Sequence, residues 1–373
     1  MSRLLVAVVV ALFGVVVLAL AFLALMYGSG VPYPPPYAPE EGRPLVPVVE
    51  LDFPLGNVTT SSTGRVFFNI HPFAQAQRFT DAFLFELIEG EAVPYPDAGS
   101  QPDLNTVFGM TVDPRGRLWL TCPAALDRDQ TRLLAYDLRT GQRVVEHAFP
   151  KGVARFAQDM RITPDGRHMI MADTGLFRFT SASLLVVDLE TFEVRKVLEG
   201  TPPVSPQDWY ITTFERLPLR LGYGLVTFTV GVDGIAIDGD AVVFAAMSHD
   251  TAYRVPLEAL LNPDLTPLEL ARQVKTLGTK PLSDGIERAP DGSILITDIE
   301  HGALARLDPE GRLTALGFSE DIIWSDGVAV TSSAAYVTDS GIPAYIDPWA
   351  RPPRREAIAA HAPYGLYRVA HTP

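Results

Sequence analysis

A repeating pattern of short strands constrains the fold of this chain more than any other feature of its sequence. A polar residue or glycine, an alternating strand, a tight turn and a second strand occur together six times, starting at Asn57, Gly109, Asp159, Asp233, Asp284 and Asp326. The starts are 52, 50, 74, 51 and 42 residues apart. A period near 50 that is built from short strands is typical of a β-propeller, in which each repeat forms one four-stranded blade. The sequence therefore predicts an all-β chain with six blades.

The strand patterns at the two ends of the repeat region predict how the ring closes. Tyr364–Val369 is the strand pattern that follows the sixth pair, so the sixth blade lacks one strand. A spare strand pattern, Val46–Asp52, precedes the first blade. We expect it to pair as the outer strand of the sixth blade, because this joins the two ends and removes an exposed sheet edge.

The N-terminal residues form a candidate transmembrane helix. Leu4–Met26 contains no charged residue, and a helix of this length spans roughly 35 Å, more than the hydrocarbon core of about 30 Å. The apolar region of a secretory signal runs only about 7–15 residues, so an uncleaved anchor is favoured over a signal peptide. Arg3 before the segment and Glu40 and Glu41 after it predict a cytoplasmic start, with the rest extracytoplasmic, in the periplasm or at the cell surface.

The sequence divides into three expected parts. Residues 1–28 are a transmembrane anchor or uncleaved signal, residues 29–44 a proline-rich linker, and residues 45–373 the six-bladed propeller. Val31–Pro47 contains seven prolines and so has few amide donors. Such a segment prefers extended polyproline geometry, and we expect it to act as a semi-rigid spacer.

Composition and motifs exclude several classes of function. Lys and Arg number 30 against 44 Asp and Glu, the net charge is −14, and no basic run offers a surface for nucleic acid. Cys122 is the single cysteine, so an intrachain disulfide and a CxxC zinc or redox motif are both excluded. GxSxG, HExxH, Walker and GxGxxG patterns are absent, so standard hydrolase, zincin and nucleotide chemistry has no support. The sequence names no protein partner.

The lengths of the connections indicate which face of the propeller carries the site. In a four-stranded blade, the start of the inner strand, the end of the second strand and the longer connections share one face. Those connections are long here: residues 69–80, 122–130, 173–182, 200–231 and 339–363. The turns on the opposite face are tight. Long irregular loops on one side of a rigid scaffold are where binding usually takes place, so we expect a small-molecule site on this face.

Polar residues, mostly aspartates, gather on the same predicted face. They open the inner strands or close the second strands, and the candidate ligand-binding residues are Asn57, Asp159, Asp173, Asp233, Asp284, Asp298, Asp326 and Asp339. Clustered carboxylates can hold a divalent cation such as Ca²⁺, attract an amine, or act as acid and base. The alternative is turn chemistry, since Asp and Asn side chains cap nearby backbone amides. The alignment of the inner strands slips by one residue between blades, which leaves open which side chains face the axis.

For each of the remaining candidates, a structural role is at least as well supported by the sequence as a functional one. Two histidines that follow second strands are either bases or ordinary loop residues, Trp324 either walls the channel or packs between blades, and five residues of the last long connection form either a lid or a solvent-exposed loop. These residues are His249 and His301, and Tyr345, Trp349, Arg351, Arg354 and Arg355.

A set of short motifs follows a fixed order from residue 64 to residue 327. It comprises Gly64-Arg-Val-Phe-Phe-Asn-Ile-His-Pro, Val93-Pro-Tyr-Pro-Asp, Gly116-Arg-Leu-Trp-Leu, Leu134-Ala-Tyr-Asp-Leu, Ala157-Gln-Asp-Met, Leu185-Val-Val-Asp-Leu, Gly231-Val-Asp-Gly-Ile-Ala, Ser283-Asp-Gly-Ile and Trp324-Ser-Asp-Gly. In order and spacing, this set resembles the major royal jelly/yellow protein family, in its bacterial, L-dopachrome tautomerase-related form. Members of that family are six-bladed propellers.

The resemblance implies a secreted protein that binds small amines or other small ligands in its channel. For some members of the family it also implies the conversion of dopachrome, a tautomerisation in which a proton leaves one carbon and returns elsewhere. Paired carboxylates are suited to moving such a proton, and an acidic mouth attracts an amino substrate. The resemblance assigns no catalytic residues.

A more distant resemblance is to the senescence-marker-protein/gluconolactonase family, whose propellers hydrolyse lactones with one divalent metal. Asp233 or Asp284 resembles the Asp-Gly position of its metal site, and Asp159 stands where that family has an Asn, so Asp159, Asp233 and Asp284 form a candidate metal set. The first inner strand offers Asn57 in place of the family's Glu. A non-catalytic binding or scaffold propeller is the third alternative.

Overall fold

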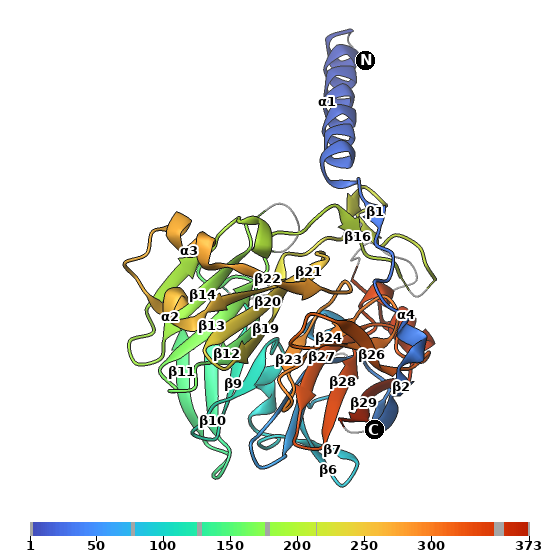
Figure 1. The fold of residues 1–373 in the computed structure, drawn as a ribbon. Helices are drawn as coiled ribbons and strands as arrows, with labels where there is room; N and C mark the ends of the chain where they lie inside the picture. The colour runs from blue at the N-terminus through green and yellow to red at the C-terminus, as the bar shows by residue number, and fades with distance from the viewer. Residues whose placement is uncertain are drawn as a thin grey trace.

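Six blades, five of them four-stranded sheets and one a five-stranded sheet, stand around a central axis, and one long helix projects from the ring (Figure 1). The computed structural model describes residues 3–75, 79–124, 129–175, 180–213, 215–346 and 354–371. The helix is α1 (Arg3–Tyr27), long and apolar enough to cross a membrane. The predicted all-β class, the six-bladed propeller and the N-terminal apolar helix are confirmed.

Each blade is a meander of antiparallel strands that runs outward from the axis. Blade one consists of β4 (Leu55–Thr60), β5 (Val66–Ile70), β6 (Leu84–Ile88) and β7 (Glu91–Pro94), and blade two consists of β8 (Met110–Val112), β9 (Arg117–Cys122), β10 (Arg132–Asp137) and β11 (Arg143–Ala148). Blade three consists of β12 (Ala157–Ile162), β13 (His168–Asp173), β14 (Ser183–Asp188) and β15 (Val194–Val197), and blade four consists of β19 (Val232–Asp238), β20 (Ala241–Ala246), β21 (Thr251–Pro256) and β22 (Lys275–Thr279). Blade five consists of β23 (Ile286–Arg288), β24 (Ile294–Asp298), β25 (Ala303–Leu307) and β26 (Leu313–Phe318), and blade six consists of β27 (Ser325–Val330), β28 (Ala334–Asp339), β29 (Tyr364–Ala370) and β3 (Val46–Leu51).

The core lies between neighbouring blades. Each inner strand contacts the inner strand of the next blade, and β27 contacts β4, which closes the ring. The second strands β5 and β20 are buried along their whole length, because their sheets pack against other blades on both faces. Strands buried on both faces have continuous apolar runs instead of alternation, which is the pattern of Ala241–Ala246.

The strand that precedes blade one completes blade six, as the sequence predicted. β3 pairs antiparallel with β29, with Leu51 opposite Tyr364 and Val49 opposite Leu366. Val48, Val49 and Leu51 pack against the core of blade one. The outer strand of the last blade therefore comes from the N-terminal side of the propeller, and the covalent chain fastens the ring.

The proline-rich segment 29–44 lies against the propeller, where the sequence indicated a spacer. β1 (Val31–Pro32) pairs in parallel with β16 (Trp209–Tyr210), and β2 (Arg43–Pro44) adds a fifth strand to blade five beside β26. Between them, the Tyr37 hydroxyl donates to Asp298 Oδ2 at 2.8 Å. Prolines remove amide donors but leave carbonyls and side chains free to make contacts, so the segment docks through its non-proline residues and short pairings.

Two helices interrupt blade four and were not expected from the strand periodicity. α2 (Leu257–Leu261) and α3 (Pro267–Gln273) lie between β21 and β22. Thr266 caps α3 in a capping box: its hydroxyl accepts from Glu269 N, and the Glu269 carboxylate accepts from Thr266 N. A Thr followed three residues later by a Glu is a recognised start signal for a helix, and this one was present in the sequence.

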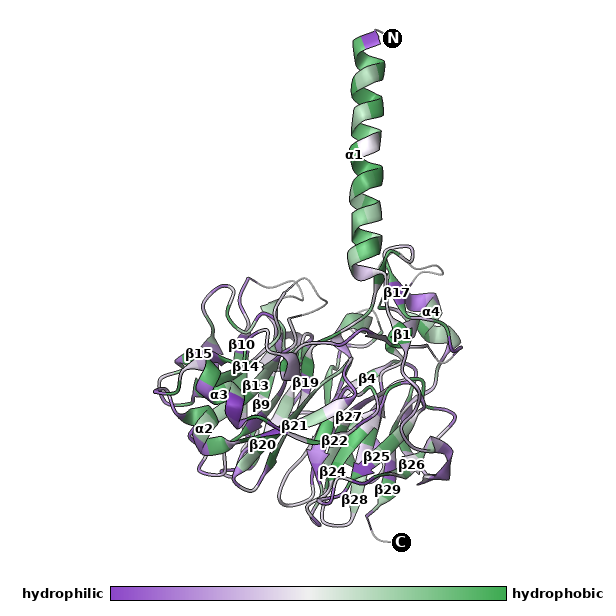
Figure 2. Cartoon of the chain, turned by 45° about the horizontal axis from the view of Figure 1, so that its top comes forward, coloured by the Kyte–Doolittle hydropathy of each residue, from purple (hydrophilic) through white to green (hydrophobic). Residues whose placement is uncertain are grey.

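The long connections form a second layer over one face of the ring. This layer, here called the cap, comprises residues 31–37, 200–213, 215–231, 340–346 and 354–363. It contains η6 (Pro202–Val204), β16, β17 (Arg220–Leu221), β18 (Val226–Thr227), η7 (Ile342–Ala344) and α4 (Arg354–Ala360). Its apolar side chains share one cluster, which includes Ile211, Leu221, Phe228, Ile342 and Ile358. Figure 2 shows β1, β17 and α4 on the side from which α1 rises.

Removal of β3 tests the closure of the ring. We expect a chain that lacks residues 1–52 to unfold at a midpoint at least about 5 °C lower than a chain that lacks residues 1–44, since β29 becomes an exposed edge and three aliphatic side chains lose their packing. Thermal unfolding followed by circular dichroism measures both midpoints. Equal midpoints would contradict this closure.

Candidate functional site

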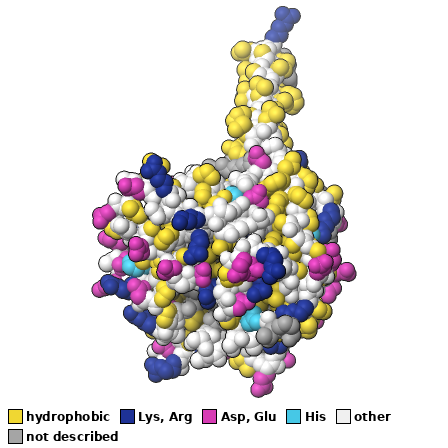
Figure 3. Space-filling model, in the orientation of Figure 1, with side chains coloured by type: hydrophobic (Ala, Val, Ile, Leu, Met, Phe, Trp, Pro, Cys, Tyr) yellow, Lys and Arg dark blue, Asp and Glu magenta, His cyan; other side chains and the backbone are white. Residues whose placement is uncertain are grey.

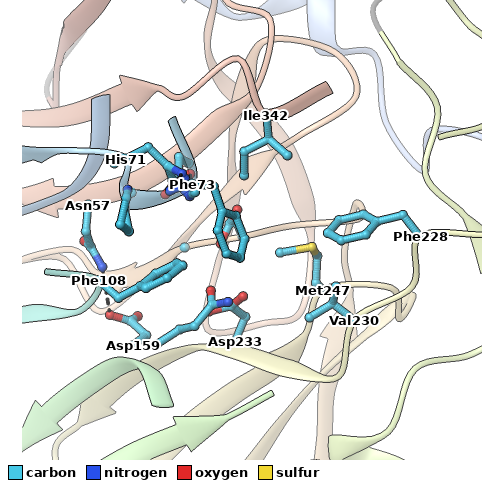
Figure 4. A pocket seen from close by; sticks show the side chains of 17 residues that line it. Asn57, His71, Phe73, Phe108, Asp159, Phe228, Val230, Asp233, Met247 and Ile342 are labelled. Atoms are coloured by element: carbon cyan, nitrogen blue, oxygen red, sulfur yellow. Dashed lines mark hydrogen bonds and ion pairs between the residues drawn. The ribbon is translucent and has the colours of Figure 1, made fainter. Parts of the chain in front are cut away.

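A pocket opens at the centre of the ring on the cap side, where the inner strands begin (Figure 4). The hollow measures about 570 Å³, which includes part of its mouth, where it opens to solvent. All six blades contribute to its lining, which consists of Gly56, Asn57, His71, Pro72, Phe73, Phe108, Gln158, Asp159, Phe228, Val230, Asp233, Met247, Asp284, Gly285, Asp326, Gly327 and Ile342. The pocket is narrow and suits a small ligand.

β-Bulges at the start of inner strands place polar side chains in this pocket. Register shifts occur near the first residues of β4, β12, β19 and β27. A bulge sets two residues opposite one and re-aims a side chain. Asn57 and Asp159 directly precede the buried apolar residue of their strand, whereas Asp233, Asp284 and Asp326 precede a glycine. The bulges compensate for the one-residue shift between the aligned inner strands. Polar residues that precede an apolar residue and polar residues that precede a glycine therefore both reach the pocket.

A threonine in the second strand holds the start of the inner strand in three blades. In each case its hydroxyl accepts from backbone amides beside the pocket: Thr121 from Gly109 N at 3.1 Å, Thr297 from Asp284 N at 3.1 Å and Gly285 N at 3.0 Å, and Thr338 from Gly327 N at 2.9 Å. The Thr338 hydroxyl also donates to Gly56 O and so joins blade six to blade one. The repeated threonine was a signal in the sequence that the motif analysis missed.

Three carboxylates form the acidic floor of the pocket: Asp233, Asp284 and Asp326 are 2%, 8% and 7% exposed. Burial raises the pKa of Asp284 to about 7. Burial, followed by the charges of Asp284 and Asp159, raises the pKa of Asp233 well above its usual range, and a side-chain hydrogen bond with Asp284 raises it further. Burial and the charge of Asp284 likewise raise the pKa of Asp326. The floor therefore holds protons that exposed aspartates would have lost at neutral pH.

Uncharged polar side chains orient the carboxylates of the acidic floor through hydrogen bonds but bring no positive charge to them. Trp324 Nε1 donates to Asp284 Oδ2 at 2.8 Å, so the tryptophan is a buried partner of the site. The Gln158 side-chain nitrogen, in the orientation that satisfies both groups, donates to Asp233 Oδ2 at 2.8 Å and Oδ1 at 3.1 Å. Asp326 Oδ2 is buried and accepts no hydrogen bond from the part of the chain that the structure describes. A buried carboxylate oxygen without a donor is costly, and it is available to a ligand.

His71 faces this unsatisfied oxygen. Its Nδ1 accepts from Phe73 N at 3.2 Å, so the proton of the neutral ring belongs on Nε2, which lies 3.9 Å from Asp326 Oδ2. Burial lowers the pKa of His71 to about 3, so the ring is neutral at physiological pH. His71 occurs in the first motif of the sequence analysis, but its role at the site was not predicted.

Aromatic and apolar side chains form the wall of the pocket. The His71, Phe73 and Phe108 rings pack against one another with centroids 5.2–5.4 Å apart, and the Phe73 and Phe108 rings meet edge to face at 82°. In Figure 4, Met247 and Phe228 lie across the pocket from these rings. The site thus combines an acidic floor with an aromatic wall, which the search for charged motifs did not reveal.

Five of the eight candidate residues meet in the pocket and three do not. Asn57, Asp159, Asp233, Asp284 and Asp326 line it. The other three cap backbone amides or side chains nearby. Asp173 accepts from Gly175 N, Asp298 from Tyr37 Oη and Glu300 N, and Asp339 from Ile323 N, Trp324 N and Gly341 N. For these three, the structure displays the turn chemistry that was the stated alternative.

The other candidates lie away from the pocket lining. His249 is buried with a pKa lowered to about 4 by burial, and its Nδ1 accepts from Thr251 N. His301 pairs with Asp298 at 2.8 Å. Tyr345 is buried and donates to Ser340 O. Of the remaining lid candidates, Arg354 and Arg355 begin α4, while Trp349 and Arg351 lie outside the described residues.

The candidate metal set does not fit a divalent cation as it stands. Asp159 Oδ1 accepts from Arg161 Nη1 at 3.0 Å and Asp159 Oδ2 accepts from Ile235 N at 3.3 Å, so a guanidinium already supplies positive charge to this carboxylate. The Gln158 amide covers Asp233. Within the described residues, no three His, Cys, Asp or Glu side chains are grouped so as to hold a metal ion. We derive no chemistry from a metal at this site.

The sequence profile described as "Major royal jelly protein" matches residues 105–320. The chain belongs to this family. Its match covers blades two to five, which include four of the six inner strands that open onto the pocket. The family resemblance deduced from the ordered motifs is therefore confirmed.

Solved structures with the same architecture include a gluconolactonase and a luciferin-regenerating enzyme. A gluconolactonase from Xanthomonas campestris is 11% identical, covers 84% of this chain and 95% of its own, and has a TM-score of 0.52. A luciferin-regenerating enzyme is 10% identical, covers 84% of this chain and 90% of its own, and has a TM-score of 0.50. At these identities the likeness shows the propeller fold alone.

One curated protein also matches part of the chain. It is named "Probable translation initiation factor IF-2", comes from Thermofilum pendens, and is 26% identical over 145 residues. The match involves 34% of this chain, which spans only 24% of the length of that relative.

The raised pKa of Asp284 predicts how stability depends on pH. The folded chain binds this proton more tightly than the unfolded chain, so the free energy of unfolding falls as the pH rises from about 4 to about 7. Asp284→Asn removes this cost and keeps an acceptor for Trp324. We expect its unfolding midpoint at pH 8 to exceed that of the native chain by about 5 °C. At pH 4.5 the midpoints should agree.

The surface substitution Asp240→Asn is the matched control, since it removes one carboxylate from an exposed turn. Its midpoint should follow that of the native chain at both pH values. If Asp284→Asn instead lowered the midpoint at pH 8, the buried carboxylate would not be the destabilising group.

Proposed function

We propose that this propeller binds a small organic cation, an aromatic amine, in the pocket at the centre of the cap side. One observation carries the proposal: among the described residues, no Lys or Arg forms an ion pair with Asp233, Asp284 or Asp326, although all three are buried. A bound ammonium group supplies the missing positive charge. Because the three carboxylates are already buried in the folded chain, an ion pair with them is stronger than one on the surface.

The aromatic side chains in the wall of the pocket favour a ligand with an aromatic ring. Phe73 and Phe108 present ring edges and faces within one small volume, and Met247 offers a polarisable thioether opposite them. The uncharged Nε2–H of His71 adds a hydrogen-bond donor beside Asp326. An aromatic amine fits both parts of the site, because its ammonium group pairs with the acidic floor and its ring packs against the aromatic wall. Membership of the royal jelly family supports the same ligand class, which the family resemblance already implied.

The proposal places this activity outside the cytoplasm on a membrane anchor. Arg3 precedes the apolar helix α1, and Glu40 and Glu41 follow it. Positive residues are retained on the cytoplasmic side of a membrane, which supports an extracytoplasmic propeller. The anchor itself rests on the length and hydropathy of α1.

A second candidate is a tautomerase that acts on dopachrome-type substrates. It is favoured by Asp284, whose pKa of about 7 suits proton exchange at neutral pH, and by its hydrogen bond with Asp233. In such a reaction the substrate loses a proton at one carbon and gains one elsewhere, so no oxidant or reductant is needed. A metal-dependent lactonase is not supported, because the candidate metal set does not fit the ion.

Replacement of the acidic floor tests the binding proposal. We expect Asp233→Asn with Asp284→Asn to weaken the binding of phenethylamine at least about tenfold, which corresponds to about 1.4 kcal/mol, because the ammonium group loses its counter-ions. Titration calorimetry at pH 8 measures the affinity. The uncharged analogue 2-phenylethanol should bind weakly to the native chain and to the variant alike.

A variant with the same change in net charge serves as control. Asp240→Asn with Asp264→Asn alters two exposed turns, and its affinity for phenethylamine should equal that of the native chain. Unchanged affinity in the floor variant would overturn the proposal. Saturable binding of Ca²⁺ that disappears in the floor variant would instead favour the lactonase alternative. Loss of the colour of dopachrome, catalysed by the native chain and abolished in the floor variant, would favour the tautomerase.

A further inference from the structure

The apolar helix joins the propeller on the face that contains the pocket. α1 contacts β18, and β18 ends one residue before the pocket residue Phe228. In Figures 1 and 2, α1 rises from the cap beside β1. The mouth of the pocket and the foot of the helix therefore share one side of the molecule.

The segment that connects α1 to the cap is too short to let the propeller rotate so that its cap faces away from the end of α1. α1 ends at Tyr27, and β1 begins at Val31. Four Cα–Cα steps span at most about 14 Å. β1 is fixed by its pairing with β16, and the Tyr33 and Trp209 rings lie 4.9 Å apart. A flexible tether would allow any orientation, but this one holds the cap next to the helix end.

The close approach of helix and cap has a local cause at Gly28. A Cβ atom at this position would lie 3.0 Å from Leu225 O and 2.5 Å from Ala24 O. Only a glycine lets the last turn of α1 approach the 222–225 turn of the cap this closely. Helix and cap thus form one continuous surface.

The exposed part of the cap near the helix has the composition of a membrane interface. Val31, Leu217 and Tyr223 are large apolar or aromatic residues that are 53%, 57% and 82% exposed. Two basic residues, Arg216 and Arg220, are exposed on the 200–231 connection, together with the acidic Asp208 and Glu215. Aromatic residues are enriched at headgroup level, and basic residues are attracted to anionic lipids. Figure 3 shows hydrophobic side chains along α1, and both hydrophobic and acidic side chains where it meets the propeller.

We propose that the cap rests on the surface of the bilayer that contains α1, with the mouth of the pocket turned toward the lipid headgroups. The occupant of this surface is the headgroup and upper acyl layer of the same membrane. The headgroup layer is about 5–8 Å thick on each side, so a connection that reaches at most about 14 Å keeps the cap at or near this layer. Ligands that partition into the interface then reach the pocket directly. This inference goes beyond the proposed function, because it requires α1 in a bilayer and no particular ligand.

Lipid-dependent quenching of a single fluorophore tests the inference. Leu217→Cys in the full chain is labelled with bimane and reconstituted in nanodiscs of phosphatidylcholine and phosphatidylglycerol; the native Cys122 is buried and does not compete for the label. Lipids that carry a headgroup nitroxide should quench this label at least about twofold more than a label on the opposite face, because the cap lies within the roughly 5–10 Å interfacial layer.

Ile88→Cys is the matched control, since Ile88 is also apolar and 44% exposed but ends β6 at the far turn of blade one. Aqueous iodide should show the reverse order and quench the Ile88→Cys label more. Equal quenching of the two labels by nitroxide lipid would overturn the inference, as would a chain that does not enter the nanodisc through α1. Neither result depends on amine binding, so the proposed function is tested separately.

Discussion

Burial of several carboxylates around one axis, together with the smaller effect of their mutual repulsion, is the main physical constraint at the centre of this propeller. Asp159, Asp233, Asp284 and Asp326 belong to four different blades, yet the geometry of the ring places them around a single axis. Each is held there by backbone that cannot move without disturbing a neighbouring blade. Arg161 relieves part of the charge, since it pairs with Asp159 at 3.0 Å and with Glu287 at 3.1 Å. The other three carboxylates are left to share protons or to take a cation.

The rest of the fold supplies the stability that this arrangement requires. The sheets bury continuous apolar strands between blades, β3 closes the ring through pairing with β29, and the Thr338 hydroxyl joins blade six to blade one. Buried like charges are a stability cost that proteins keep at functional sites. Aromatic side chains and the cap residues Phe228 and Ile342 line the same pocket. Burial raises the cost of the uncompensated acids and strengthens any ion pair that a ligand makes with them.

The period of the repeat was enough to predict the blades, because each inner strand and turn has its own local signature. Closure by β3 also followed from the sequence, since an unpaired strand pattern and an incomplete blade imply each other. The acidic floor followed from the radial arrangement, which brings equivalent positions of distant repeats together. All three floor residues were among the eight candidates, but the sequence did not separate them from the candidates that stay outside the pocket, because a bulge and a capping turn look alike in sequence: Asp326 enters the pocket, whereas Asp339 caps the turn before β27.

Contacts that depend on the packing of loops were not predictable in the same way. His71, Phe73 and Phe108 are brought together by connections from two blades, and nothing in their local sequence specifies that meeting. The contacts of segment 29–44 with the propeller could not be predicted for a related reason, because a proline-rich composition predicts an extended backbone but not what lies beside it. α3 is different, because its capping box was present in the sequence and was outweighed by the surrounding strand pattern.

The number of protons exchanged when an amine binds measures the central claim most directly. Burial raises the pKa values of these acids, to about 7 for Asp284, and a cation placed among them lowers the pKa values and drives protons off the carboxyl groups. Calorimetric titration of the native chain with phenethylamine at pH 7, repeated in two buffers with different ionisation enthalpies, gives this number. We expect net proton release on binding. Binding without proton release would show that the buried acids are already ionised, or that the amine binds elsewhere.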